Sequence, residues 1–118
     1  MAGKLFLAWV DRLTAWATMF ALGRTDAGDR VLERTTSRNR EERIYALSLI
    51  GSHKIREGRD ILERVVRNER DPLRDTAVRA LGDLGDPASL YALRSIRDGS
   101  DRNLAFDAEA AMRKIEEG

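Results

Sequence analysis

Residues 71–85 read DPLRDTAVRALGDLG, and this stretch decides the fold class that we expect of the chain. Val78, Leu81 and Leu84 recur every third residue, which places them on one side of an α-helix. A proline stands near the start of the stretch and a glycine at its end, as at the two ends of many helices. The stretch therefore predicts an amphipathic helix over 72–84.

The same pattern occurs twice more along the chain, which indicates an internal repeat. It recurs 34 residues earlier and 31 residues later, and we interpret the difference as an insertion in the loop around His53–Glu57. At a spacing of 34 residues, the matched pairs are Val78 with Ile44, Leu81 with Leu47, Leu84 with Ile50 and Gly85 with Gly51. At a spacing of 31 residues, they are Ala77 with Ala108, Ala80 with Ala111, Leu81 with Met112 and Leu84 with Ile115.

The segments between these helices repeat as well, so the chain is predicted to fold as helix pairs joined by short turns. No stretch alternates with the two-residue period of a strand. Leu62 and Val65 match Leu93 and Ile96 at a spacing of 31, and Val31, Leu32 and Thr35 match Ile61, Leu62 and Val65 at a spacing of 30. The expected helices are 4–22, 27–36, 40–50, 57–67, 72–84, 88–98 and 102–116.

Residues that start and end helices lie between these segments. Asn39, with Glu42 three residues later, has the spacing of a capping box. The Asp-Pro pairs at 71–72 and 86–87 each offer a carboxylate at the N-cap and a proline in the first turn. The glycines expected at left-handed C-terminal positions are Gly23, Gly51, Gly85 and Gly99.

Residues 71–88, together with the string LYAL at 90–93, resemble the HEAT-like repeat named after phycobilisome lyases. The likeness extends over 38–67 and 101–115. Such a repeat is a pair of antiparallel helices that stacks on its neighbours. The resemblance therefore implies an all-α fold, a right-handed α-solenoid of about three to four helix pairs, in one domain over 1–118.

The first predicted helix departs from this pattern because Trp16, Thr18 and Phe20 replace the small and aliphatic residues of the later units. Leu5–Leu22 is apolar at 14 of 18 positions, but Asp11 and Arg12 lie at its centre. Each charge would cost about 2.5–3.5 kcal/mol at the centre of a bilayer, so we expect no transmembrane segment.

Residues 1–24 are therefore expected to form an apolar, Trp-containing N-terminal helix. Its apolar side chains cover more of the circumference than one neighbouring helix layer buries. Two readings stay open: the helix caps its own array, or it forms an interface with a second copy or another protein. The candidate partner-binding residues on it are Leu5, Trp9, Leu13, Trp16 and Phe20.

A second candidate surface is rich in arginine. Six arginines lie between residues 56 and 74, and the second helices of such units usually line the concave, partner-binding surface. Arg56, Arg59 and Arg67 are the candidates for contacts with phosphate or carboxylate groups. Opposite charges four residues apart along 56–67 favour the alternative of an exposed helix supported by its own ion pairs.

Composition limits the chemistry that we expect. The absence of cysteine excludes disulfides and thiolate chemistry, and it fits a reducing, cytoplasmic compartment. His53, the only histidine, has no ligand-spaced acidic neighbours, and no phosphate-binding loop or nucleophile motif occurs. We therefore expect no catalytic residue, no cofactor and no metal.

The sequence favours a non-catalytic module that binds another protein or itself. A net charge of +1 gives no general field for nucleic acid. Nucleic-acid or phosphate binding through 56–74 and a chromophore-lyase-like role are the alternatives. The helix expected at 102–116 lacks a following helix to complete its pair, which adds a second surface for a partner.

Overall fold

Helices account for the fold in the computed structural model, which describes the backbone of residues 2–118 and the side chains of residues 8–118. No strand occurs in that part of the chain, so the all-α expectation is confirmed. The α-helices are α1 (Ala2–Ala21), α2 (Thr25–Glu33), α3 (Arg40–Ser52), α4 (Arg59–Arg67), α5 (Arg74–Leu84), α6 (Leu90–Arg97) and α7 (Arg102–Glu117). Short 3₁₀ turns stand at Arg34–Thr36, Arg56–Gly58 and Pro87–Ser89.

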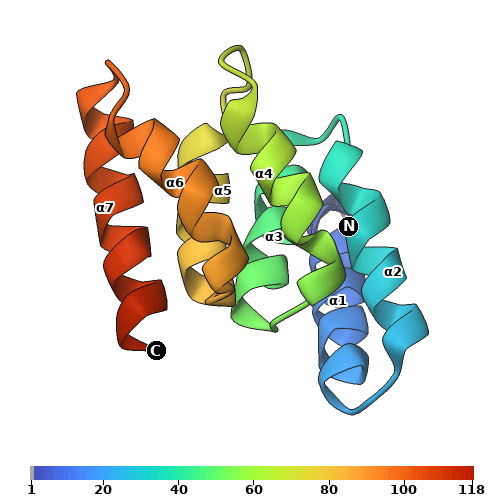
Figure 1. Ribbon diagram of the computed structural model, residues 1–118. Coiled ribbons are helices and arrows are strands. Elements are labelled where there is room, and N and C mark those ends of the chain that lie inside the picture. The colour runs from blue at the N-terminus through green and yellow to red at the C-terminus, as the bar shows by residue number, and fades with distance from the viewer. Residues whose placement is uncertain (1) are drawn as a thin grey trace.

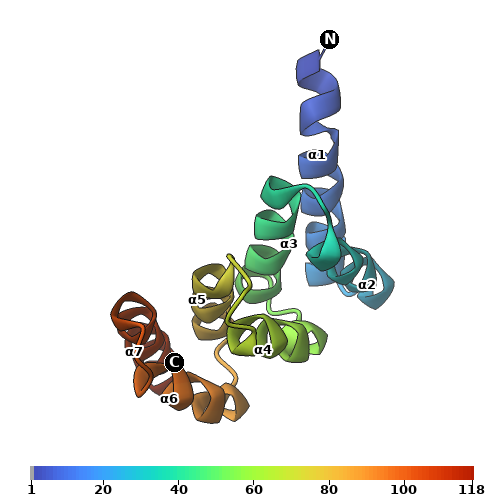
Figure 2. The ribbon, with the colours of Figure 1, turned by 90° about the horizontal axis from the view of Figure 1, so that it is seen from above.

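The helices form two rows (Figures 1 and 2). We call α3, α5 and α7 the inner row and α2, α4 and α6 the outer row. Neighbours in the inner row are in extensive contact, whereas neighbours in the outer row touch at few places. The array therefore bends toward the inner row, and α1 extends that row beyond α3 (Figure 2).

The packing also corrects how the helices pair. α4 packs on α5, α6 packs on α7, and α2 with its 3₁₀ turn packs on α3, so each unit is an outer helix followed by an inner one. The expectation that 102–116 lacks a second helix is therefore wrong, because α6 precedes α7 and completes its unit. Of its apolar side chains, Ala108, Ala111, Met112 and Ile115 are at 6% exposure or less, whereas Phe106 is 69% exposed.

Small residues set the spacing of the inner row. A methyl group on Gly51 of α3 would lie 2.6 Å from the carbonyl oxygen of Ala80 in α5, so the two backbones nearly touch. Gly82 of α5 meets Ala111 of α7 in the same way, at 2.9 Å from its Cα. Both residues of the second contact lie 31 residues after those of the first. The packing repeat is therefore 31 throughout, and the spacing of 34 predicted for α3 and α5 is wrong.

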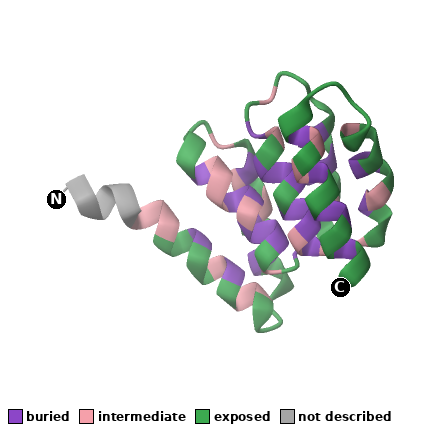
Figure 3. Cartoon of the chain, turned by 90° about the vertical axis from the view of Figure 1, so that its left-hand side faces the viewer, coloured by how far each residue is buried: buried purple, intermediate pink, exposed green. Residues whose placement is uncertain are grey.

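The core lies between the two rows, where buried residues form a continuous band (Figure 3). Every unit contributes fully buried aliphatic side chains to one cluster. Leu47, Ile50, Leu81 and Val78 come from the inner row, and Val31, Leu62, Val66 and Leu93 come from the outer row. Of the other positions that the helical period assigned to the core in α3 and α5, Leu84 is buried as well, whereas Ile44 is only half-buried.

The predicted helix starts are only partly present. The side chain of Asn39 accepts hydrogen bonds from the amides of Glu41 and Glu42, but its own amide donates to Ser37, so half of the capping box forms. Asp86 accepts from the amide of Ala88, as predicted. Asp71 accepts a hydrogen bond from the amide of Leu73, but α5 begins only at Arg74, so Pro72 precedes the helix and is not in its first turn.

Two of the four glycines expected in the left-handed region lie there, Gly23 at φ 101° and Gly85 at φ 75°. The prediction is wrong for Gly51 and Gly99. Gly51 lies inside α3, where its missing side chain allows the contact with α5, and Lys54 takes the positive φ that follows that helix. The backbone of Gly99 has no positive φ.

Candidate protein-docking grooves

The difference between the two rows leaves hollows on the outer side. Close contacts hold the inner helices together, while the outer helices diverge around the bend. A hollow of about 450 Å³ separates α2 from α4, and one of about 490 Å³ separates α4 from α6. We call them the first groove and the second groove. Many of their lining residues correspond at a spacing of 31, so the two grooves are successive copies of one feature.

The first groove combines an apolar floor with a polar rim. Leu32 from α2 and Ile61 and Val65 from α4 line the floor, and each is buried or half-buried. Exposed Glu33 and Arg64 stand at the edges. A surface of this kind suits an apolar side chain of a partner, because burial drives binding while the rim limits the orientations that fit.

An arginine closes the inner end of the first groove. The Nε of Arg43 donates to the backbone oxygen of Thr35 at 2.8 Å. The two terminal nitrogens of Arg43 donate to the two carboxylate oxygens of Asp71, at 2.9 and 2.5 Å. This bidentate pair is mostly buried, with the side chains 20% and 10% exposed, and it joins the first unit to the second.

The ion pair also moves the pKa of both groups. Hydrogen bonds from Arg43 hold the pKa of the Asp71 carboxyl below its ordinary value of 3.8, and the amide of Leu73 acts in the same direction against the effect of burial. The hydrogen-bonded carboxylate raises the pKa of Arg43 in turn. Both groups therefore stay charged over the whole neutral range.

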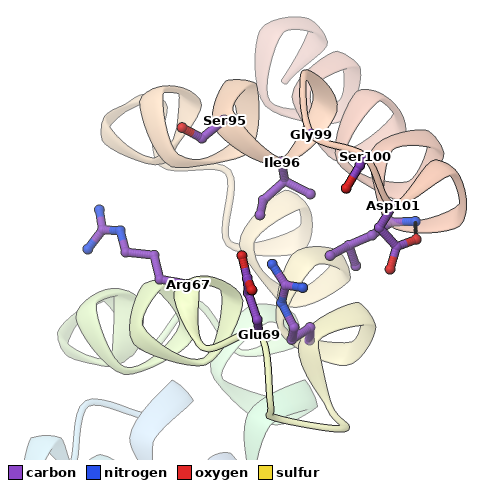
Figure 4. A pocket seen from close by; sticks show the side chains of 9 residues that line it. Arg67, Glu69, Ser95, Ile96, Gly99, Ser100 and Asp101 are labelled. Atoms are coloured by element: carbon purple, nitrogen blue, oxygen red, sulfur yellow. Dashed lines mark hydrogen bonds between the residues drawn. The ribbon is translucent and has the colours of Figure 1, made fainter.

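The second groove repeats this construction. Arg74, 31 residues after Arg43, donates from Nε to the backbone oxygen of Val66 at 2.8 Å, and Val66 lies 31 residues after Thr35. Arg67 and Glu69 lie on the α4 side of this groove, facing Ser95 and Ile96 of α6 (Figure 4). The 3₁₀ turn that follows α2 and the end of α4 thus each have a backbone carbonyl group bound by an arginine of the next inner helix.

The arginines predicted to bind a partner are largely engaged by their own helix. The side chain of Glu63 is 8% exposed, and its carboxylate accepts hydrogen bonds from Arg59 at 2.5 Å, from Arg67 at 3.2 Å and from the hydroxyl of Ser89 at 3.2 Å. The hydrogen bond to Glu63 raises the pKa of Arg59. Arg56 is exposed and forms no ion pair with any described residue.

The location predicted for these arginines is also wrong. α4 belongs to the outer row, so Arg56, Arg59 and Arg67 do not line the concave side of the array. The assignment failed because α4 was taken as the second helix of its unit, whereas it is the first. Two of the predicted ion pairs form, Arg59 with Glu63 and Glu63 with Arg67, and Asp60 pairs with Arg59 instead of with Arg56 or Arg64.

The candidate residues of α1 make contacts within the chain. Leu13 is fully buried in the core, so its side chain offers no surface to a partner. Trp9 packs edge-on against Tyr45 of α3, with ring centroids 6.2 Å apart. Trp16 lies under the guanidinium of Arg34 at 5.8 Å, and Phe20 packs against Gly28 of α2. The side chain of Leu5 lies outside the described residues.

The exposed face of α1 is mostly polar or small from Ala8 onward (Figure 3). Thr14, on this face, exchanges a hydrogen bond with the hydroxyl of Tyr45 at 2.5 Å. Trp9, Trp16 and Phe20 are half-buried against the neighbouring helices. Leu22, just after α1, is the large apolar side chain most exposed among those described, at 80%.

No group of acidic or histidine side chains with the arrangement of a metal site occurs among the described residues. His53 is half-buried at the end of α3, and its Nδ1 lies 3.0 Å from the hydroxyl of Ser52. Across the part of the chain that the structure describes, none of the helices combines the length and apolar character needed to cross a membrane.

Sequence comparison agrees with this geometry. A family model described as HEAT repeats matches residues 28–113, a region that begins within α2 and ends within the last turns of α7. The chain belongs to the HEAT repeat family. The matched region contains the three outer–inner helix pairs, so these pairs are its HEAT repeats, and α1 precedes them. No curated protein and no solved structure matches the chain.

The two grooves and the arginines that close them were not predicted. The signal was the spacing of Arg43 and Arg74, which are 31 residues apart like the matched residues of α4 and α6. It conflicted with the spacing of 34 adopted for the inner helices. An acidic residue at 71, before the second of these arginines, was interpreted as a cap alone.

Proposed function

We propose that this HEAT repeat chain is a non-catalytic scaffold module that binds another protein through the outer grooves. The observation that carries the proposal is the first groove, with Leu32, Ile61 and Val65 beneath a rim of Glu33 and Arg64. Repeat arrays present extended surfaces to protein partners, most often on the concave side, and the two grooves place such a surface on the outer side of this array. Apolar floors with polar rims are the usual anatomy of protein interfaces.

Charge supports a protein partner over nucleic acid. Arg59 and Arg67 are held by Glu63, and both grooves carry acidic side chains, Glu33 in the first and Glu69 in the second. A phosphate backbone needs several cations free to replace its counterions. Nucleic-acid binding through 56–74 therefore has less support than protein docking, and a steep loss of binding with salt is the result that would favour it.

The displaced pKa values support a structural role for the charged groups. Hydrogen-bonded arginines lower the pKa of Asp26 and of Asp71. Hydrogen-bonded carboxylates raise the pKa of Arg43 and of Arg59. Each shift keeps its group charged near neutral pH, whereas a general acid or base needs a pKa close to the working pH. The likeness of 71–98 to the phycobilisome-lyase type of repeat supports the fold and assigns no chromophore chemistry to these residues.

The contacts of α1 support a capping role for this helix. Trp9, Trp16 and Phe20 each have a neighbour within the chain. Self-association through α1 is the competing proposal, since these aromatic side chains remain partly exposed and Leu22, just after the helix, is 80% exposed. Sedimentation velocity distinguishes the two. A monomer supports the cap, and a dimer that dissociates in the Trp9→Glu, Trp16→Glu double variant supports the interface.

Site-specific photo-crosslinking in the source cell tests the docking proposal. A benzophenone amino acid replaces Arg64 at the rim of the first groove, and the matched control replaces Glu109, an exposed residue of α7. We expect a defined adduct with one other protein from position 64 and little from position 109. Equal yields at both positions, or an adduct of twice the mass of the chain, would contradict docking of a separate partner in the outer grooves.

A further inference from the structure

The two grooves differ at one charge. In the first groove each of the three nitrogens of the Arg43 guanidinium donates a hydrogen bond, to Thr35 or to Asp71. In the second groove the Nε of Arg74 binds Val66, and its terminal nitrogens form no hydrogen bond or ion pair with any described residue. Arg43 and Arg74 therefore occupy equivalent positions in the two grooves, but only Arg43 is bound to a carboxylate.

The missing partner is explained by the sequence. The position 31 residues after Asp71 is Arg102, an exposed residue at the first position of α7. Asp101, one residue earlier, lines the second groove, but its carboxylate accepts from the amide of Leu104 and caps α7. The substitution of a basic residue at 102 thus leaves the guanidinium of Arg74 without a bound carboxylate.

Arg74 is held in a suitable position for binding. It is half-buried at the second groove, and its hydrogen bond to Val66 fixes the orientation of the guanidinium. The groove wall includes the side chains of Ser95 and Ser100, with Ile96 and Leu104 beside them. A carboxylate that enters this groove meets a planar pair of donors already in place, which reduces the entropy lost on binding.

We propose that Arg74 binds an acidic side chain of the docked partner protein, in the way that Arg43 binds Asp71 within the chain. The proposal rests on the proposed docking function and adds the chemistry of one contact to it. A partner that places an apolar residue in the first groove and an Asp or Glu in the second would use both copies of the groove.

The acidic residues of the second groove favour a carboxylate over a phosphate. Glu69 and Asp101 line the groove, and Arg67 already contacts Glu63. A group with a charge near −2 is repelled by two neighbouring carboxylates more strongly than a group with a charge of −1. The geometry of Asp71 on Arg43 shows that a single carboxylate satisfies both terminal nitrogens.

The test uses a probe taken from the chain itself. A peptide of residues 70–73 with blocked ends carries Asp71 as its only acidic residue, and its Asp71→Asn version is the matched control. Binding to the intact protein is followed by NMR from the Nε–H signal of the Arg74 side chain. We expect the acidic peptide to shift this signal and the amide version to bind roughly tenfold more weakly, as expected for losing a charge-assisted hydrogen bond.

Two protein variants separate binding from folding. Arg74→Gln removes the guanidinium, and Arg102→Asp leaves it in place while adding a carboxylate at the position equivalent to Asp71. An acidic residue in the first turn of α7 suits the helix dipole, so we expect the second variant to fold normally. Both variants should bind the acidic peptide about tenfold more weakly than the unchanged protein does, whereas Arg79→Gln on the inner row should leave its binding unchanged.

Three results would overturn the proposal: equal binding of the two peptides, unchanged binding to Arg102→Asp, or a larger shift of the Arg74 signal with inorganic phosphate than with acetate. The crosslink from position 64 keeps this failure distinct from failure of the docking function. If that adduct persists while the peptide does not bind, docking stands and the role of Arg74 is wrong. If the peptide binds and the adduct is absent, the anion site stands without the docking function.

Discussion

Neighbouring helices are joined differently in the inner row and in the outer row. In the inner row, Gly51 and Gly82 bring neighbouring backbones into contact with Ala80 and Ala111. In the outer row the helices diverge, and an arginine at the base of each groove binds the end of the preceding outer helix. The comparison indicates that close backbone packing holds this array together along one side, while the other side keeps open surface for a partner.

The largest expected effect contrasts two fully buried leucines. Leu81 lies in α5, which packs against α3 and α7, whereas Leu62 lies in α4 of the outer row. We expect Leu81→Ala to lower the free energy of unfolding by about 2–5 kcal/mol, near the top of that range, and Leu62→Ala by less. Urea denaturation followed by circular dichroism measures both. A greater loss at 62 would show that the outer row carries the stability.

The ion pair between Arg43 and Asp71 tests the first groove, where the arginine is bound to a carboxylate. Because the pKa of Asp71 is lower in the folded chain than in the unfolded one, its stabilisation is complete above its ordinary pKa of 3.8. That stabilisation is lost as the pH falls through the lowered pKa. We expect Asp71→Asn to cost about 1.5–3 kcal/mol at pH 7 and less at pH 2, measured by denaturation across this range. A cost that does not change with pH would mean that the charge of Asp71 is unimportant.

The effect of adding a methyl group can be compared at two glycines, Gly51 in the inner row and Gly58 beside the outer row. A methyl group on Gly51 meets backbone atoms of Ala80, which cannot move aside without separating α3 from α5. The atoms nearest to a methyl group on Gly58, before α4, belong to the side chains of Ile50 and Leu32, at 2.7–2.9 Å, and not to a helix backbone. We expect Gly51→Ala to destabilise by about 1–3 kcal/mol and Gly58→Ala by clearly less, as read from thermal denaturation. Similar losses at both sites would remove the contrast between the rows.

The smallest effect is expected for an exposed charge of the inner row. Arg79 pairs with Asp75 one helical turn earlier, and both side chains are more than half exposed. We expect Arg79→Ala to change the free energy of unfolding by less than about 0.5 kcal/mol, and by less still in high salt. The same denaturation assay with and without salt serves as its own control, and a loss above 1 kcal/mol would place this arginine among the structural contacts.

The helices were predictable because the helical period of buried residues persists in every unit. Leu62 and Leu93 were matched at 31 residues from sequence, and both are fully buried at equivalent places in α4 and α6. The pairing of the helices was not predictable in this way. Three residues join the first 3₁₀ turn to α3, and three join α3 to the next turn, so loop length alone does not say which neighbour α3 pairs with.

The predicted spacing of 34 residues between α3 and α5 was wrong for a related reason. Gly85 matched Gly51 by residue type, but Gly51 serves a close contact between helices and Gly85 a left-handed turn. Identical residues thus satisfy different physical demands, and only the contact partner distinguishes them. The grooves escaped prediction because they arise from the divergence of two helices, which no single helix encodes in its own pattern.

The close contacts of the inner row also determine how the array deforms. Backbones that touch at Gly51 and Gly82 cannot be compressed further, and separating them exposes the core. The outer helices have few mutual contacts to lose. Rotation about the inner row is therefore the bending motion that costs least, and it changes the width of the grooves between the outer helices.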